Sequence, residues 1–370
     1  MKLTCSRTVL AGAFQTVSGV VPTRTPKPIL QNIKLQALPG QLIITGTDQE
    51  IGIRYQVNDV NVQRPGEALL PTSRTAAILR ELQGEEVTIE VADEVTYIRG
   101  ERSEYKLGYT DPAEFPAVAE FEFSDYFIVA ADQFRQLIRR TVFATDTEST
   151  RYALGGVLLD IKDSRLTLAA TDTRRLAVAR GTCSAHGSPK SENTAPVIPS
   201  KAMTLIERSL GGSEEPVWIV IRQNDVLVRS GPTTLYSRLV EGRFPRYEDV
   251  IPKQSEITVD LVAGPFHSAV RQAQIVTSDE SRGVDFRFAA GLLTLTSAAA
   301  EVGQSKIELP IALDQGDLSI VFDPRYVSDF LKVLPPEQAL QLELQDSDSA
   351  ALFKTMDGYQ YIVMPLAKDQ

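Results

Sequence analysis

A threefold internal repeat constrains the fold of this chain more than any other feature. A helix-like segment opens each third of the sequence, and its apolar residues recur three and four positions apart. The three segments are Val9 to Val17, Phe134 to Arg140 and Phe266 to Ala273. Further landmarks follow each segment in the same order. Because one copy of a repeat is one structural unit, the pattern predicts three similar tandem domains.

The second landmark is a hairpin-like stretch. Alternating apolar residues on both sides of a polar pair predict two antiparallel strands joined by a turn. The polar pairs are Thr47-Asp48, Thr171-Asp172 and Thr296-Ser297. Short polar side chains stabilise turns, so we expect these pairs to have a structural role.

The last two landmarks close each copy. A second helix is predicted to start at Pro71-Thr72, Pro199-Ser200 and Asp323-Pro324, where Pro, Ser, Thr and Asp are good N-terminal signals. Short strands and a closing pair follow, at Phe115-Pro116, Phe244-Pro245 and Met364-Pro365. The predicted class is therefore α+β, with domains at 1–124, 125–253 and 254–370. The sole obvious insertion, 183–194, is polar and predicted to be a surface loop.

Composition narrows the function. The chain has two cysteines, Cys5 and Cys183, which is too few for a disulfide framework. No apolar stretch is long enough to span a bilayer, and the N-terminus lacks the apolar core of a signal peptide. We therefore expect a cytoplasmic protein without membrane contact. The net charge of −10 argues against a general nucleic-acid binder unless the positive residues gather on one surface.

The sequence also argues against an enzyme. Its two histidines, His186 and His267, do not have metal-ligand spacing, and neither a nucleophile elbow nor a phosphate-binding loop is present. Two explanations of the repeat remain. In the first, duplication serves bulk alone, as in a repeat-built binding module. Alternatively, the copies join along their sheet edges, and a head-to-tail dimer closes the row.

Seven short motifs, taken in order, resemble those of one family, the beta subunit of bacterial DNA polymerase III, the replicative sliding clamp. The motifs are Pro28-Ile29-Leu30, Gly46-Thr47-Asp48, Glu114-Phe115-Pro116, Ala170-Thr171-Asp172, Arg175-Leu176-Ala177-Val178, Gly242-Arg243-Phe244-Pro245 and Val363-Met364-Pro365-Leu366. The resemblance covers essentially the whole chain.

The resemblance implies a ring of two chains and six domains, with helices inside and antiparallel sheets outside. Such a ring encircles double-stranded DNA without reading its sequence and tethers the replicative polymerase for processivity. It implies a homodimer, a separate clamp loader, and other DNA-processing and repair proteins that carry a short clamp-binding peptide. It implies no cofactor, and ATP is not expected because the loader supplies the energy of loading.

The predicted helices carry basic residues that could line such a ring, since phosphate contacts position a protein without specifying sequence. Arg24 and Tyr152 stand where the family contacts DNA. Arg140, Arg271 and Lys332 are further basic candidates on these helices. The predicted DNA-facing set is Arg24, Arg74, Arg80, Arg135, Arg139, Tyr152, Lys201 and Arg208. For any single residue, an ordinary solvated helix face explains the charge equally well.

The resemblance also implies one peptide-binding pocket per chain, which accepts a Gln followed by apolar residues. The matching positions are Leu154, Thr171, Thr173, Arg174, Arg175, Leu176, Pro245, Asp249, Val250, Ile362, Val363, Met364, Pro365 and Leu366. Judged singly, Leu154 and its apolar neighbours are more simply core residues. The chain departs from the family's pattern at Thr173, Arg174, Asp249, Asp348 and Ala350, so we expect a shifted peptide preference.

The resemblance places the dimer interface between two segments. One is the strand around Tyr105 and Leu107, and the other is the third-domain segment around Ile275 and Val276. Residues 103–108 alternate apolar and charged side chains, as an edge strand with one buried face does. The alternative is that these residues belong to the cores of their own domains.

Overall fold

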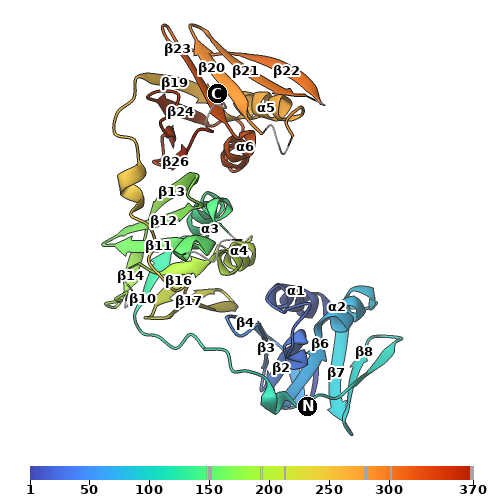
Figure 1. Cartoon of the computed structure of the whole chain (residues 1–370). Helices are drawn as coiled ribbons and strands as arrows, with labels where there is room; N and C mark the ends of the chain where they lie inside the picture. The colour runs from blue at the N-terminus through green and yellow to red at the C-terminus, as the bar shows by residue number, and fades with distance from the viewer. Residues whose placement is uncertain are drawn as a thin grey trace. The chain divides into compact units, whose positions relative to one another are not determined.

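The computed structural model describes residues 1–370 except 147, 149–151, 192, 194, 212–213, 279–281, 301 and 367–370. Figure 1 shows the order of helices and strands along the chain. The same order occurs three times, which confirms the repeat and the α+β class. We call the segments β1–β9, β10–β18 and β19–β26 the first, second and third copies.

The elements of each copy follow one plan: a strand, a helix, several strands, a second helix and three closing strands. The first copy has β1 Lys2–Ser6, α1 Arg7–Ser18, β2 Asn32–Leu38, β3 Gln41–Thr47, β4 Ile51–Asn58, β5 Asn61–Arg64, β6 Gly66–Pro71, α2 Thr72–Glu81, β7 Glu86–Ala92, β8 Val95–Arg99 and β9 Glu104–Gly108. The second has β10 Tyr126–Val129, α3 Ala131–Arg139, β11 Gly156–Lys162, β12 Arg165–Thr171, β13 Arg175–Thr182, β14 Ser184–His186, β15 Val197–Pro199, α4 Ser200–Ser209, β16 Val217–Ile221, β17 Asp225–Ser230 and β18 Thr233–Arg238. The third has β19 Ile257–Val262, α5 Ala263–Gln274, β20 Val284–Ala289, β21 Leu292–Ala299, β22 Gly303–Pro310, β23 Asp317–Phe322, α6 Pro324–Lys332, β24 Ala339–Leu344, β25 Ala351–Thr355 and β26 Gln360–Val363.

The local sequence explains where the helices start and which face they bury. The side chain of Ser6 accepts a hydrogen bond from the Val9 amide at the start of α1, and Asp323 does the same for Arg325 in α6. Apolar faces then pack the helices in pairs, α1 with α2 and α5 with α6 (Figure 1). Leu10, Phe14 and Val17 of α1 are buried at the spacing of one helical stripe.

The sheets join neighbouring copies. The order β14-β10-β16-β17-β18-β4-β3-β2-β6 places the last strand of the second copy beside β4 of the first. The order β15-β11-β12-β13-β26-β25-β24-β19 places the last strand of the third copy beside β13 of the second. Strands β9 and β22, the counterparts of these joining strands, end the two remaining sheets, β5-β1-β7-β8-β9 and β22-β21-β20-β23. Both therefore carry an open edge in the single chain.

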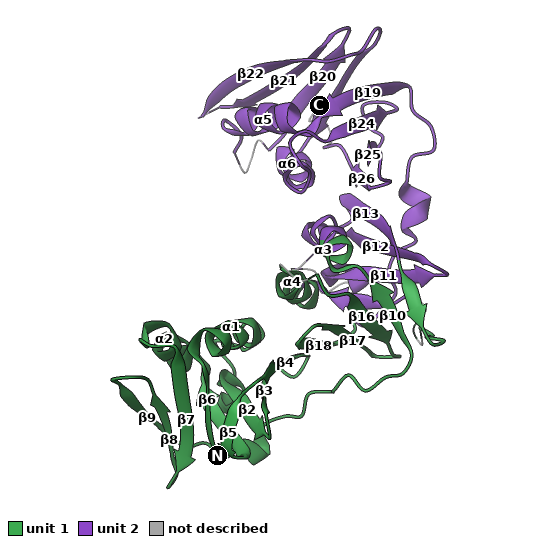
Figure 2. Cartoon of the chain, turned by 180° about the vertical axis from the view of Figure 1, so that it is seen from behind, with its two compact units in different colours: residues 1–135, 183–194, 201–239 green, residues 136–182, 195–200, 240–370 purple. Residues whose placement is uncertain are grey.

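The chain divides into two compact units that cut across the copies (Figure 2). The first unit contains residues 1–135, 183–194 and 201–239, and the second contains 136–182, 195–200 and 240–370. Each unit has its own two sheets and buried core. The domain boundaries at 124/125 and 253/254 remain predictions; both positions lie outside helices and strands.

The structure corrects two predictions about turns and loops. Thr296 and Ser297 do not form a turn, because β21 continues through them to Ala299 and pairs them with Lys306 and Ser305. The insertion at 183–194 is not wholly a loop. It begins with the buried Cys183 and the short strand β14, which pairs with β10. His186 of β14 stacks on Tyr126, with the ring centroids 4.9 Å apart.

Candidate ligand-binding pocket and basic helices

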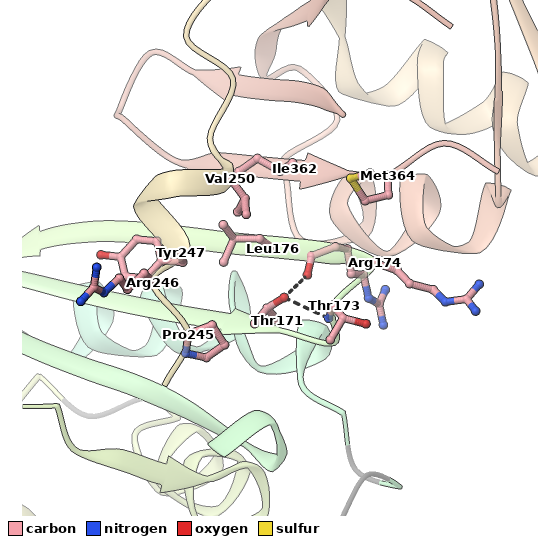
Figure 3. Close-up of a pocket in the computed structure, with 11 residues that line it drawn as sticks. Thr171, Thr173, Arg174, Leu176, Pro245, Arg246, Tyr247, Val250, Ile362 and Met364 are labelled. Atoms are coloured by element: carbon pink, nitrogen blue, oxygen red, sulfur yellow. Dashed lines mark hydrogen bonds between the residues drawn. The ribbon is translucent and has the colours of Figure 1, made fainter. Parts of the chain in front are cut away.

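A cavity of about 260 Å³ lies within the second compact unit (Figure 3). Its walls come from the turn between β12 and β13, from Pro245 and the short helix η5 Tyr247–Val250, and from β26 with the residue that follows it. The lining residues are Thr171, Thr173, Arg174, Arg175, Leu176, Pro245, Arg246, Tyr247, Val250, Ile362 and Met364. Segments from the second and third copies thus meet at one concave surface, which suits a short extended ligand.

A tight turn fixes one wall of this pocket. The hydroxyl of Thr171 donates to the carbonyl of Arg175 at 2.7 Å, and the Asp172 carboxylate accepts from the amides of Arg174 and Arg175 at 3.0 and 2.9 Å. Thr173 has φ 76° and donates its amide to Thr171 at 3.1 Å. Asp48 accepts from two amides in the matching turn of the first copy, so these Thr-Asp pairs stabilise turns, as predicted from their sequence.

Arg175 stabilises the wall of the pocket through contacts with the surrounding protein. Its side chain is 10% exposed and forms ion pairs with Asp172 at 2.9 Å and with Asp329 of α6 at 2.8 Å. It also donates to the Phe143 carbonyl at 2.8 Å and lies 4.6 Å from the centre of the Tyr326 ring. Burial acts to lower the pKa of Arg175, but Tyr361, Asp329 and Asp172 outweigh it and raise the pKa. The guanidinium therefore stays charged and committed to these protein partners.

The apolar part of the pocket has a buried floor and an exposed rim. Leu176 and Ile362 are 2% and 3% exposed and belong to a core cluster that also contains Tyr247. Val250 and Met364 are 57% and 45% exposed. Large apolar side chains that stay exposed at the mouth of a cavity mark a binding surface more often than a packing fault. A ligand covering Val250 and Met364 would gain apolar contact without disturbing the floor.

The pocket only partly coincides with the set named from sequence. Thr171, Thr173, Arg174, Arg175, Leu176, Pro245, Val250, Ile362 and Met364 line it. The other five of that set, Leu154, Asp249, Val363, Pro365 and Leu366, do not line the cavity. Leu154 and Val363 are buried, while the amide of Leu366 donates to Val321 of β23 at 2.8 Å. Ala350 packs against the core cluster that contains the pocket floor.

Two residues that line the pocket, Arg246 and Tyr247, are absent from the set predicted from sequence. They directly follow the Phe244-Pro245 motif, so their position was available as a signal. Tyr247 is buried, and burial, followed by the charge of Glu248, raises its pKa to about 12. Its hydroxyl therefore stays neutral at physiological pH and suits a position at the base of a largely apolar pocket. The exposed Arg246 adds a second positive charge to the lining, at the opposite end of the pocket from Arg174 (Figure 3).

The helices concentrate positive charge. Each of α1 to α6 contains more Lys and Arg than Asp and Glu, although the whole chain carries −10. Arg24, Arg74, Arg80, Arg139, Lys201 and Arg208 are exposed. Lys201 forms an ion pair with Asp48 and Arg135 pairs with Glu207 at 3.3 Å, so part of this charge is internally balanced. Tyr152 opens a short helix, η4, and its side chain lies outside the described part of the structure.

Arg140 is not a surface residue, contrary to its place among the candidates for facing DNA. It is 4% exposed and forms an ion pair with Asp357 at 2.6 Å, and its guanidinium lies 4.9 Å from the centre of the buried Tyr359 ring. Burial acts to raise the pKa of Asp357, but hydrogen bonds from Thr355 and Arg140 outweigh it and lower the pKa. Arg140 therefore ties the α3 region to the β25–β26 hairpin.

The segments predicted to form a dimer interface are accessible in the single chain. Glu104, Lys106 and Gly108 of β9 are exposed, while Tyr105 and Leu107 are half-buried, which gives the strand one apolar and one charged face. Ile275 directly follows α5 and is 75% exposed, and Val276 beside it is half-buried. Neither Leu107 nor Ile275 is therefore a core residue of its own domain.

No helix among the described residues has the length and apolar character that crossing a bilayer requires. No three His, Cys, Asp or Glu side chains in the described ranges converge on a position that could hold a metal ion.

Comparison with known families matches all three copies. Residues 1–119 match the DNA polymerase III beta subunit N-terminal domain, 128–246 match its central domain, and 248–367 match its C-terminal domain. The chain is 31% identical over 370 residues to a protein of Pseudomonas aeruginosa named beta sliding clamp, covering 99% of this chain and 100% of that one.

Solved structures agree with this match. The structure of the DNA polymerase III subunit beta from Pseudomonas aeruginosa is 30% identical, covers 99% of this chain and 100% of its own, and gives a TM-score of 0.91. The DNA polymerase sliding clamp from Bacillus subtilis is 27% identical over 100% of both chains, with a TM-score of 0.93.

Proposed function

Because this chain belongs to the DNA polymerase III beta subunit family, the sliding clamps, we propose that two copies of it close a ring around double-stranded DNA. The protein is a non-catalytic processivity factor that serves the replicative polymerase on DNA. The alternative of a binding module unrelated to replication is not favoured. The proposal adds how the ring closes, where DNA runs, and how partners dock. We place this activity in the cytoplasm.

The observation that carries the DNA-facing part of the proposal is the contrast in charge between the helices and the whole chain. Basic residues that outnumber acidic ones on every one of α1 to α6 attract phosphates, while the remaining surface is strongly acidic. Contacts to phosphates carry no sequence information, so a lining of this kind lets DNA slide. Arg74 of α2 and Arg208 of α4 are exposed members of this lining in the proposal, and the exposed Arg24, which follows α1 in the chain, adds to it.

The open edges support closure by a second copy. Strand β18 pairs with β4, and β26 pairs with β13. The last strand of the second and of the third copy thus pairs with the third strand after the first helix of the copy before it. The equivalent strands, β9 of the first copy and β22 of the third, each end a sheet among the described residues and have one edge available for pairing. Pairing β9 of one chain with β22 of another repeats the internal joint and covers both edges. Leu107 and Ile275 supply the apolar contact at this joint.

Retention on circular DNA tests the proposed ring. After loading by a bacterial clamp loader onto a nicked plasmid, the protein should stay bound through gel filtration at salt that removes ordinary phosphate binders. It should be lost when a restriction enzyme linearises the plasmid, because a ring slides off an end. Equal loss from circular and linear DNA would show simple electrostatic binding and refute encirclement.

The pocket is proposed to bind the polymerase, the clamp loader and other proteins through a short peptide, a Gln followed by apolar residues. The apolar rim of Val250 and Met364 above a buried floor provides the contact, and the flexible thioether of Met364 adapts to different anchors. We retain Leu154, Asp249, Val363, Pro365 and Leu366 as flanking positions of this site, although they do not line the cavity.

Arg174 should tune which peptides bind best. It is exposed and lines the pocket, whereas Arg175 is fully engaged by Asp172 and Asp329. A peptide with Asp inside the motif should therefore bind about two- to fivefold more tightly than its Ser counterpart, as an exposed ion pair permits. Fluorescence anisotropy at low and high salt measures this difference. The preference should vanish in Arg174→Ala; equal affinity of the two peptides for the unaltered protein would refute the role.

A further inference from the structure

The two internal joints share one register. In the first, Leu235 of β18 lies opposite Ile53 of β4, and in the second, Tyr361 of β26 lies opposite Ala177 of β13. These residues hold matching places in their copies. Leu235 and Tyr361 lie opposite Val228 and Phe353 of the preceding strands. The repeat therefore specifies a register that can be transferred to the strands without a partner.

The same places can be identified on the open edges. On β9 the counterpart is Tyr105, which lies opposite Ile98 of β8. On β22 it is Ser305, which lies opposite Ser297 of β21, as Ile53 lies opposite Gly46 and Ala177 opposite Ala170. Placing Tyr105 opposite Ser305 in an antiparallel pair brings Glu104 opposite Lys306.

The exposure of the side chains on β9 and β22 independently indicates which residues of the two strands share a face. Tyr105 and Leu107 are half-buried and alternate with exposed Glu104 and Lys106. Ser305 and Ile307 are half-buried and alternate with exposed Lys306 and Glu308. A shift by one residue would turn the charged face of one strand toward the apolar face of the other. Only a shift of one strand by an even number of residues keeps the half-buried side chains of β9 and β22 on one face and the exposed charges on the other.

The charges on the exposed face then distinguish the transferred register from those shifted by two residues. In the transferred register Glu104 faces Lys306, and Lys106 faces the neutral Gln304. Moving the strands by two residues one way sets Glu104 against Glu308 and Lys106 against Lys306. Moving them by two the other way sets Arg102 against Lys306. Like charges directly opposite each other destabilise a strand pair, so the transferred register is the one the charges favour.

We infer that β9 and β22 of two chains pair with Tyr105 opposite Ser305, and that the Glu104–Lys306 charge pair selects this register and this partner. The inference rests on the proposed homodimer and deepens it. Within one chain Glu104 already pairs with Arg99 at 2.7 Å, and Lys306 pairs with Glu308 at 2.6 Å. Association adds Lys306 on the open side of Glu104, which completes an alternating row of charges across the joint.

Charge exchange tests this inference. Glu104→Lys alone and Lys306→Glu alone each place like charges opposite each other at both joints of a homodimer. Each should raise the dimer Kd by about tenfold or more, given the energies of opposed charges across strands. When the two variants are mixed, both joints of a mixed dimer again carry opposite charges, so the affinity should return toward that of the unaltered protein. Sedimentation equilibrium with one variant fluorescently labelled measures all three values.

Two controls complete the design. The double variant with both changes should form a homodimer as tightly as the mixture, and the exposed Glu241→Lys should change nothing. Failure of the mixture and the double variant to recover, with a dimeric unaltered protein, would overturn the register and leave the dimer standing. Tighter association of Glu104→Lys would indicate the register in which Glu104 faces Glu308. A monomeric unaltered protein would refute the homodimer itself.

Discussion

Leu107→Asp is expected to leave the protein as a monomer of 40.6 kDa, where light scattering of the unaltered protein should give twice that mass. Leu107 is half-buried on the apolar face of the open edge β9. An aspartate there would be enclosed without a cation at both joints of the proposed dimer. Because an unpaired buried charge costs several kcal/mol, we expect the dimer Kd to rise by at least about a hundredfold.

Ile275→Asp should also prevent dimer formation, and it should do so without destabilising the folded monomer. Its side chain is 75% exposed in the single chain, so the change does not disturb the monomer. Val262→Asp is the matched control, since Val262 is also apolar and exposed, at 44%, but lies at the start of α5 and outside both edge strands. A dimer that survives both Leu107→Asp and Ile275→Asp would show that these segments do not form the joint.

The second large effect concerns the pocket. Met364→Asp should weaken binding of a clamp-binding peptide by about a hundredfold, because a carboxylate would replace an apolar contact at the rim that an apolar anchor covers. Met364 is 45% exposed and lines the cavity, so the fold should tolerate the change. Fluorescence anisotropy with a labelled peptide and thermal melting of the free protein measure the two effects.

Met356→Asp is the matched control for the pocket. Met356 is 93% exposed and lies between β25 and β26, away from the residues that line the cavity. The same chemical change there should leave peptide affinity and mass unchanged. Comparable losses from the two methionine variants would mean that charge alone, and not occupation of the rim, controls peptide binding.

The repeat and the helix starts were accessible from sequence because local signals specify them. Apolar stripes predicted the first helix of each copy, start signals predicted the second, and Asp323 caps α6 at its predicted start. The third hairpin was misplaced because Thr296 and Ser297 resemble the polar pairs of the other copies. Strand β22, which pairs with both residues, allows β21 to run on to Ala299 instead. Pairing between strands is a tertiary influence that overrides local turn preference.

The site was harder to predict than the fold because burial cannot be read from residue type. Arg140 and Arg139 are adjacent arginines in one helical segment, yet Arg140 is enclosed by Asp357 and Tyr359, which lie far along the chain. Likewise Arg174 and Arg175 are adjacent, and only Arg175 is drawn inward by Asp329. Sequence gives the position of such charges, whereas their partners come from another copy of the repeat.

The shared sheets also make the middle copy different from its neighbours. Its strand β18 completes the sheet of the first copy, and its strand β13 receives β26 from the third. Excised from the chain, this copy would present both a donating and an accepting edge on every molecule. Identical pieces with two complementary edges associate head to tail, and such contacts give a closed ring if the rotation between pieces closes and an open filament if it does not. Tandem duplication within one chain covers both edges of the middle copy and leaves only β9 and β22 for contact with a second chain.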